Sequence, residues 1–185
     1  MIEQISDVLD AAKIEAGRLV LQKSQTDLSQ IINTVYKTFQ TVAAKKRITI
    51  STRVANLPPQ LIDGVRINQV LNNLVSNSIK FTNPDGKIKI EASQKGNFVE
   101  VSVSDNGIGI PIDKQQDIFS KFYQVGGVEH KDGSGLGLFI VKGVVEAHNG
   151  QVNLYSEEGK GTTISFTIPI AANQPFQVPN FRTLN

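Results

Sequence analysis

Asn73, Asn77 and Lys80 have the side chains and the spacing to bind a metal ion and a phosphate group. They stand at positions i, i+4 and i+7, so a helix over 63–81 places all three on one line of its surface. An amide oxygen is a hard, neutral ligand that suits Mg²⁺, and a lysine one turn further on can pair with a phosphate. For this helix taken alone, the alternative is a pair of solvated surface amides.

The segment from Val101 to Ile110 predicts a strand that delivers a carboxylate to a glycine-containing loop. Val101–Asp105 alternates between apolar and polar residues, and Asn106-Gly107-Ile108-Gly109-Ile110 follows. Glycines let a ligand approach the backbone closely, and an aspartate can accept a hydrogen bond from an exocyclic amine such as N6 of adenine. The alternative is a simple Asp-Asn-Gly turn at a strand end, where these residues are common.

Seven of the 15 glycines lie between Gly107 and Gly137, and the last of them belong to Gly133-Ser134-Gly135-Leu136-Gly137-Leu138. This run opens a helix predicted over 136–148. Backbone N–H groups at the positive end of a helix bind anions, and phosphates are the usual anion. The G-x-G-x-G spacing differs from the dinucleotide fingerprint, and no G-x-x-x-x-G-K-[ST] occurs, which excludes a P-loop. Taken alone, the run would also fit a flexible connector.

The elements that must position these residues alternate in a pattern typical of an α+β fold. Helices are predicted over 27–46, 63–81 and 136–148, with strands over 48–54, 87–93, 98–105, 151–155 and 162–170 and a short strand over 19–23. Most strands are joined as hairpins. We therefore expect a two-layer sandwich, with a mixed, mostly antiparallel sheet and helices on one face. The order offers no repeated strand–helix–strand crossovers, which argues against a Rossmann fold.

The first 19 residues carry apolar or small side chains in steps of three and four, at Ile2, Ile5, Leu9, Ala12, Ala16 and Leu19. Such a seam predicts a coiled coil or helical hairpin, here the end of a longer helix; the alternative is an amphipathic helix that folds back on its own domain. Residues 171–185 have no period and predict a tail or linker. The expected division is therefore 1–18 for the end of a dimerisation helix, 19–170 for the main domain, and 171–185 for the tail.

Composition excludes several classes of protein. The chain has 185 residues and a formal net charge of +2, too small to indicate a nucleic-acid partner. No segment approaches the roughly 18 apolar residues of a transmembrane helix, and no signal peptide is visible. With no cysteine and two histidines, His130 and His148, the chain has no disulfide and no thiolate site, and a zinc site is not expected. We expect a cytoplasmic location, with any membrane anchor upstream.

In this order the motifs resemble those of the GHKL ATP-binding family, which has the Bergerat fold. Asn73–Phe81 is similar to the family's N box, Asp105–Ile110 to its first glycine box, Phe119–Phe122 to its F box and Gly133–Leu138 to its second glycine box, while Gly159-Lys160-Gly161-Thr162 resembles its last glycine box. Within the family, the chain most resembles the catalytic ATP-binding domain of sensor histidine kinases, over about residues 19–170.

The resemblance implies ATP and Mg²⁺ as cofactors and a role for each matching residue. Asp105 would bind the adenine amine with Phe81 near the base, Asn77 would hold Mg²⁺, and Asn73 and Lys80 would act near the triphosphate as the catalytic pair. Residues 123–134 would form a lid, in which Gln124 replaces an arginine of many relatives. The remaining ATP-binding positions implied are Gly107, Gly109, Ile110, Phe122, Gly133, Gly135, Leu136, Gly137, Leu138 and Thr162.

The resemblance also favours phosphoryl transfer over hydrolysis. Related ATPases carry a water-activating glutamate at the position of Asn73, and an amide cannot act as a base at neutral pH. Neither His130 nor His148 lies in an acceptor motif, so the phosphorylated histidine is expected on a helical hairpin before Met1 or on another protein. Expected partners are that hairpin, a response-regulator receiver domain, and a second copy through the Ile2–Leu19 helix. The alternatives are a non-catalytic nucleotide-binding regulatory module and an interaction fragment whose ATP site is incidental.

Overall fold

The main sheet is built from five segments in which apolar and polar residues alternate. In the computed structural model, which describes residues 2–123 and 134–170, the strands are β2 (Thr49–Val54), β4 (Lys87–Lys95), β5 (Phe98–Asp105), β6 (Val152–Glu157) and β7 (Gly161–Pro169). Their order is β2-β4-β5-β7-β6. β2 pairs with β4 in parallel and the other pairs are antiparallel, which confirms the mixed, mostly antiparallel sheet that the sequence predicts.

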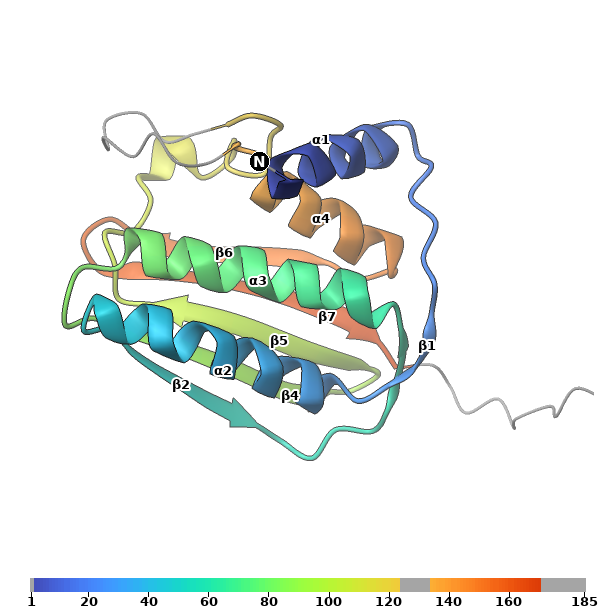
Figure 1. Ribbon diagram of the computed structural model, residues 1–185, viewed down its shortest axis with the longest axis horizontal. Helices are drawn as coiled ribbons and strands as arrows, with labels where there is room; N and C mark the ends of the chain where they lie inside the picture. The colour runs from blue at the N-terminus through green and yellow to red at the C-terminus, as the bar shows by residue number, and fades with distance from the viewer. Residues whose placement is uncertain (1, 124–133, 171–185) are drawn as a thin grey trace, which may run out of the picture.

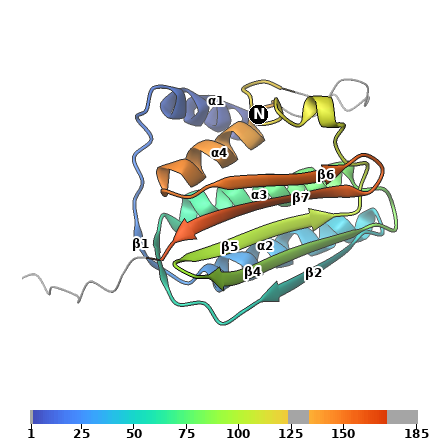
Figure 2. The ribbon, with the colours of Figure 1, turned by 180° about the vertical axis from the view of Figure 1, so that it is seen from behind.

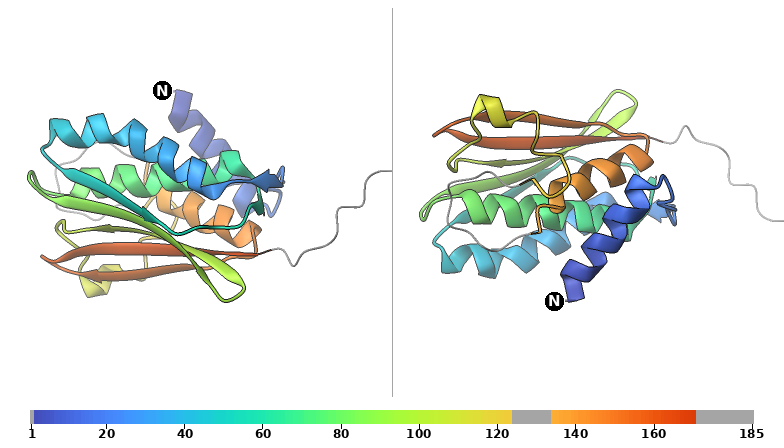
Figure 3. Two further views of the ribbon diagram at one scale, coloured as in Figure 1. Left: turned by 90° about the horizontal axis from the view of Figure 1, so that it is seen from below. Right: turned by 90° about the horizontal axis from the view of Figure 1, so that it is seen from above.

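Three helices cover one face of this sheet: α2 (Leu28–Lys45), α3 (Gly64–Phe81) and α4 (Gly137–Ala147) (Figures 1 and 3). Seen from behind, no helix of the described residues covers the opposite face (Figure 2). The core lies between the two layers, where alternate strand residues meet the apolar stripes of the helices. Its fully buried side chains include Ile88, Ile90, Val101, Phe166, Leu71, Ile140 and Val144.

The start of α3 is fixed by Asp63, whose carboxylate accepts a hydrogen bond from the Arg66 N–H at 3.1 Å. The same carboxylate accepts the Gln22 N–H at 2.8 Å. This second bond explains why the strand predicted over 19–23 is wrong, because the backbone there is an extended connection that bonds to a side chain. The strand begins further on, as β1 (Ser24–Thr26), and pairs with the unpredicted β3 (Gln60–Ile62).

The N-terminal helix α1 (Ile2–Glu15) is shorter than the predicted seam, since Ala16–Leu19 lie beyond its end and Leu19 packs against the core. α1 packs against α4 through one face and reaches α3 through the Asp10 side chain (Figure 1). On that face Asp10 is buried and accepts hydrogen bonds from Arg66 at 2.5 Å and from Gln69 at 3.0 Å. Burial tends to raise the pKa of Asp10, but these bonds outweigh it, so its pKa lies below the usual value.

The opposite face of α1 carries the predicted seam. Ile5 and Leu9 are 60% and 56% exposed, and Ala12 is exposed as well. One face of α1 thus packs on its own domain, as the second interpretation predicts, while a contact of the exposed seam with another helix stays a prediction. A short 3₁₀ turn, η1 (Ile112–Lys114), completes the described elements.

Candidate functional site

The structure brings the predicted site residues together around the C-terminal half of α3. Ser78 of α3 donates a hydrogen bond to Asp105 at the end of β5, over 2.9 Å. Further along the helix axis, Asn73 donates to the backbone carbonyl of Gly137 in the first turn of α4, over 3.3 Å. Thr162 of β7 is the direct cross-strand neighbour of Asp105. Three motifs that are far apart in the sequence therefore meet at one edge of the sandwich.

Asp105 is the half-buried carboxylate of this cluster. One of its oxygens accepts the Ser78 hydroxyl and the other accepts the Gly107 N–H at 3.0 Å, while the backbone N–H of Thr162 is a third donor. Burial raises the pKa of the Asp105 carboxyl above its usual value, because the three hydrogen bonds offset only part of the desolvation. The carboxylate is thus fixed in orientation by the protein itself.

The loop after Asp105 contacts the end of α3 on one side and the end of β6 on the other. On one side the Ile108 N–H donates to the Phe81 carbonyl at 3.1 Å, at the end of α3. On the other side Gly109 has φ +67°, and a Cβ added to it would lie 2.0 Å from the Glu157 carbonyl oxygen of β6. Only glycine fits that position, which explains one of the two glycines in this motif.

Gly107 and Ile110 hold the two ends of the same loop. A Cβ added to Gly107 would lie 2.3 Å from the Phe81 carbonyl oxygen. The Ile110 N–H donates to the Ser156 hydroxyl at 2.9 Å, and that hydroxyl lies 2.9 Å from the hydroxyl of Thr162. The loop is therefore a rigid connection between the end of α3 and the β6–β7 hairpin.

The Asn73–Asn77–Lys80 line lies half-buried on α3, as the spacing predicts. Asn73 already uses its amide N–H in the bond to Gly137. No hydrogen-bond partner for Asn77 exists among the residues that the structure describes. The Lys80 ammonium lies 5.3 Å from the centre of the Phe81 ring. An amide oxygen that has no partner among the described residues and lies beside a cation is suited to a metal ion and an anionic group.

The second glycine motif forms the entry to α4. Gly135 has φ +67°, and a Cβ there would lie 2.7 Å from the backbone of Phe122 in the F box. Phe122 is itself 59% exposed and has φ +61°. Leu136 is fully buried and Leu138 packs against the core, so the first turn of α4 is anchored beside Asn73. Gly133, and with it Gln124, His130 and most of the predicted lid, lies outside the described residues.

Ser78 is the site residue that sequence reasoning missed. It occupies the buried stripe of α3, four residues after Leu74, and is 7% exposed. A serine in an otherwise apolar stripe needs a hydrogen-bond partner, because burying an unpaired hydroxyl is unfavourable. That anomaly in the pattern could have identified it, although not its partner.

His148 is a structural residue. It lies at the end of α4 and is 2% exposed. Its Nε2 accepts the Asp63 N–H at 3.0 Å, and its Nδ1 lies 2.8 Å from the Val144 carbonyl, to which the neutral ring donates. Burial lowers the pKa of His148 below its usual value. The ring therefore joins the end of α4 to the start of α3.

Comparison with known proteins supplies the family. Residues 62–172 match the family model described as "Histidine kinase-, DNA gyrase B-, and HSP90-like ATPase". The chain belongs to this family. Within it, the chain is the catalytic ATP-binding domain of a two-component sensor histidine kinase, as the motifs predict.

Three relatives illustrate the similarity. A sensor-like histidine kinase of Rhizobium meliloti is 35% identical over 176 residues, which cover 94% of this chain and 34% of that protein. The crystal structure of full-length ShkA in complex with AMPPNP matches with a TM-score of 0.82 at 32% identity, over 94% of this chain and 36% of that chain. Histidine kinase ThkA, crystallised with the response regulator protein TrrA, matches with a TM-score of 0.71 at 29% identity, over 92% and 49%. The chain spans about a third of the Rhizobium protein and of ShkA.

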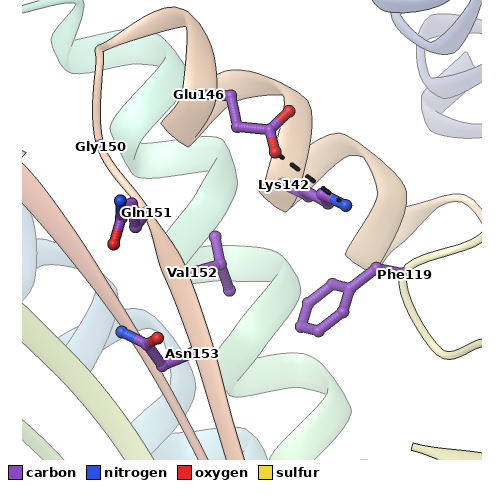
Figure 4. Close-up of a pocket in the computed structure, with 7 residues that line it drawn as sticks. All are labelled: Phe119, Lys142, Glu146, Gly150, Gln151, Val152 and Asn153. Atoms are coloured by element: carbon purple, nitrogen blue, oxygen red, sulfur yellow. Dashed lines mark ion pairs between the residues drawn. The ribbon is translucent and has the colours of Figure 1, made fainter. Parts of the chain in front are cut away.

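This catalytic domain also has a hollow that lies apart from the predicted site. A hollow of about 240 Å³ lies between α4 and the start of β6, where Lys142 and Glu146 form an ion pair at 4.0 Å (Figure 4). The F-box residue Phe119 borders it, but none of the predicted ATP-binding residues does. Among the described helices, none is long and apolar enough to cross a membrane.

Proposed function

We propose that this domain binds Mg-ATP at the edge formed by α3, the end of β5 and the start of α4. There it transfers the γ-phosphoryl group to a histidine on a helical hairpin outside these 185 residues. The observation that carries the proposal is the convergence of Asp105, the Asn73–Asn77–Lys80 line and the first turn of α4 on one edge of the sandwich. We further propose the division into residues 1–18, 19–170 and 171–185.

The base binds at Asp105. A carboxylate held by three protein donors keeps acceptor capacity for one more hydrogen, and the exocyclic amine of adenine supplies it. Phe81 is half-buried one turn after Asn77, where its ring contacts the base. The loop Gly107–Ile110 and Thr162 lie next to the carboxylate and complete the base site.

The phosphates and the metal bind along α3 and at the start of α4. Asn77 fits a Mg²⁺ ligand, because its amide oxygen is a hard donor with no partner among the described residues. Those residues include no group of three or more His, Asp or Glu side chains that could hold a metal, so Asn77 would hold Mg²⁺ together with phosphate oxygens and water. The bound Mg²⁺ would neutralise charge on the phosphates. Lys80 pairs with a phosphate, and the backbone N–H groups of residues 135–138 approach the triphosphate.

Catalysis by this chain consists of positioning and charge neutralisation, as in other phosphoryl transfer. Asn73, bonded to the Gly137 carbonyl, places an amide where a general base would be required for hydrolysis. An amide has no basic lone pair at neutral pH, so water is not activated there. This supports transfer to an acceptor histidine over hydrolysis.

Two partners follow from the relatives and from α1. AMPPNP, the ligand of ShkA, is an analogue of ATP, and ThkA was crystallised with a response regulator. We propose that the phosphoryl group passes from the hairpin to a response-regulator receiver domain. The exposed seam at Ile5 and Leu9 would form the contact with a second copy.

The test is transfer in trans. The chain is incubated with γ-labelled ATP, Mg²⁺ and separately expressed helical hairpins that carry a candidate acceptor histidine, and label on each hairpin is followed with time. We expect acid-labile label on the hairpin and none on the chain alone. Stable label on the chain alone would overturn the placement of the acceptor outside it. Tight nucleotide binding without transfer to any hairpin would instead select a nucleotide-binding regulatory module.

A further inference from the structure

Ser78 places a hydroxyl donor directly on the carboxylate that we assign to the base. It lies on the buried face of α3, 7% exposed, and its Oγ is 2.9 Å from Oδ2 of Asp105. A buried serine hydroxyl has one proton to donate, and here that proton is directed at a carboxylate rather than at the preceding turn of its own helix. A hydrogen bond to a charged group is also stronger than one between neutral groups.

The number of hydrogen bonds that the Asp105 carboxylate can accept shows what the Ser78 bond contributes. A carboxylate accepts about four hydrogen bonds, and protein donors at Ser78, Gly107 and Thr162 take three. Two of these donors are backbone N–H groups. One belongs to Gly107 and bonds to Oδ1, and the other belongs to Thr162 on the neighbouring strand. Ser78 is the side-chain donor among the described residues, and its bond to Oδ2, together with the Gly107 bond to Oδ1, fixes how the plane of the carboxylate is turned about the Cβ–Cγ bond.

The same bond favours an acceptor-only carboxylate. Burial favours the protonated acid, and each donor opposes that effect. A protonated Asp105 could donate a hydrogen bond to the 6-oxo group of a purine. An ionised Asp105 would be repelled by that group, because both atoms are acceptors and neither carries a hydrogen. Loss of the Ser78 donor would therefore weaken both the orientation and the ionised state.

We propose that Ser78 is a positioning residue for base recognition, which holds Asp105 so that its remaining acceptor site meets the 6-amino group of the purine. The proposal rests on the proposed function, since it assumes that Asp105 binds the base. Ser78 acts through Asp105 and need not touch the nucleotide. Its effect should therefore depend on the presence of the amino group.

The test compares ATP with purine riboside 5′-triphosphate, which lacks the 6-amino group, in binding titrations of the 185-residue chain. Ser78→Ala should weaken ATP binding about tenfold, the scale of one hydrogen bond to a charged group, and change binding of the analogue less than about twofold. Ser78→Thr keeps the hydroxyl and should retain most of the ATP affinity. Ser76→Ala, at an exposed position of the same helix, is the matched control and should change neither.

Equal loss of both nucleotides in Ser78→Ala would mean that the residue merely supports the fold, and would overturn the proposal. Unchanged ATP binding would overturn it as well. Asp105→Asn separates this proposal from the proposed function. If Asp105→Asn leaves the preference for ATP over the analogue intact, the assignment of the base to Asp105 fails. If it abolishes the preference while Ser78→Ala does not reduce it, only the role of Ser78 fails.

Discussion

The base end and the phosphate end of the proposed site are built differently. At the base end, Asp105 takes three protein donors, and the loop after it is bonded to both Phe81 and the β6–β7 hairpin. At the phosphate end, Asn77 has no partner among the described residues, and Asn73 makes one long bond of 3.3 Å.

This difference indicates an order of assembly. A preformed base site binds with little loss of conformational entropy, whereas Asn77, which has no partner among the described residues, would gain one from a bound ligand. We therefore expect the base to be recognised by a rigid site, and the metal and phosphates to complete the other end. Substitutions at the two ends should separate binding of the base from transfer of the phosphoryl group.

The largest effect is expected at the phosphate end. Asn77→Ala removes the proposed metal ligand and should slow transfer to the hairpin by roughly 100- to 1000-fold, the scale of losing one group that stabilises the transition state. Nucleotide binding without Mg²⁺ should change little. Asn72→Ala makes the same substitution on the same helix, off the line of Asn73 and Lys80, and should transfer normally. Normal transfer by Asn77→Ala would refute the metal assignment.

The second prediction concerns the rigidity of the base end. Gly109→Ala forces an L side chain into φ +67° and against the Glu157 carbonyl, so it should lower the free energy of unfolding by about 3 kcal/mol or more. Gly96→Ala is the matched control, since Gly96 has φ +59° with no atom near the added Cβ. It should cost only about 1–2 kcal/mol. Equal costs in urea unfolding would show that the loop can move and that the base end is not preformed.

The third prediction is loss of base recognition. Asp105→Asn leaves the shape of the side chain but replaces the charged acceptor with an amide that no longer suits the Ser78 and Gly107 donors. ATP affinity should fall about 10- to 100-fold. Asp85→Asn, in an exposed ion pair with Arg47, changes charge in the same way and should bind ATP normally. Calorimetric titration of both variants distinguishes a specific contact from a general effect of charge.

The smallest effect concerns the ends of α3 and α4 that lie away from the phosphates. The pKa of buried His148 is lowered from about 6.5, so in mildly acidic solution the unfolded chain binds a proton more readily than the folded chain. The contribution of neutral His148 to the free energy of unfolding is therefore complete above about pH 6.5. It is lost as the pH falls from there through the lowered pKa of the folded state.

Urea unfolding at pH 7.5 and 5.5 measures this loss. His148→Gln does not titrate, yet it can accept the Asp63 N–H, so its stability should change less between the two pH values. An equal change in both proteins would assign the acid sensitivity to other groups.

Much of the fold and of the site was predictable from local pattern. Alternation and 3.6-residue periodicity are properties of neighbouring residues, so they located the five strands of the main sheet and the three covering helices. The motifs around Asn73, Asp105 and Gly135 were visible because each is a short run. The predicted strand over 19–23 failed, because Gln22 bonds to the Asp63 side chain rather than to a neighbouring strand, and β3 is too short to show a period.

The sequence by itself therefore determined the order along the chain of the five main strands and the three covering helices, the mixed character of the sheet, and which residue types could bind a nucleotide. Only the tertiary structure decided that Ser78 donates to Asp105 across 27 residues, and that α1 uses Asp10 to pack on α3 while its seam faces outward. The physical reason is that periodicity reports which face of an element is apolar. The partner of a buried polar group depends on how elements far apart in the sequence pack together.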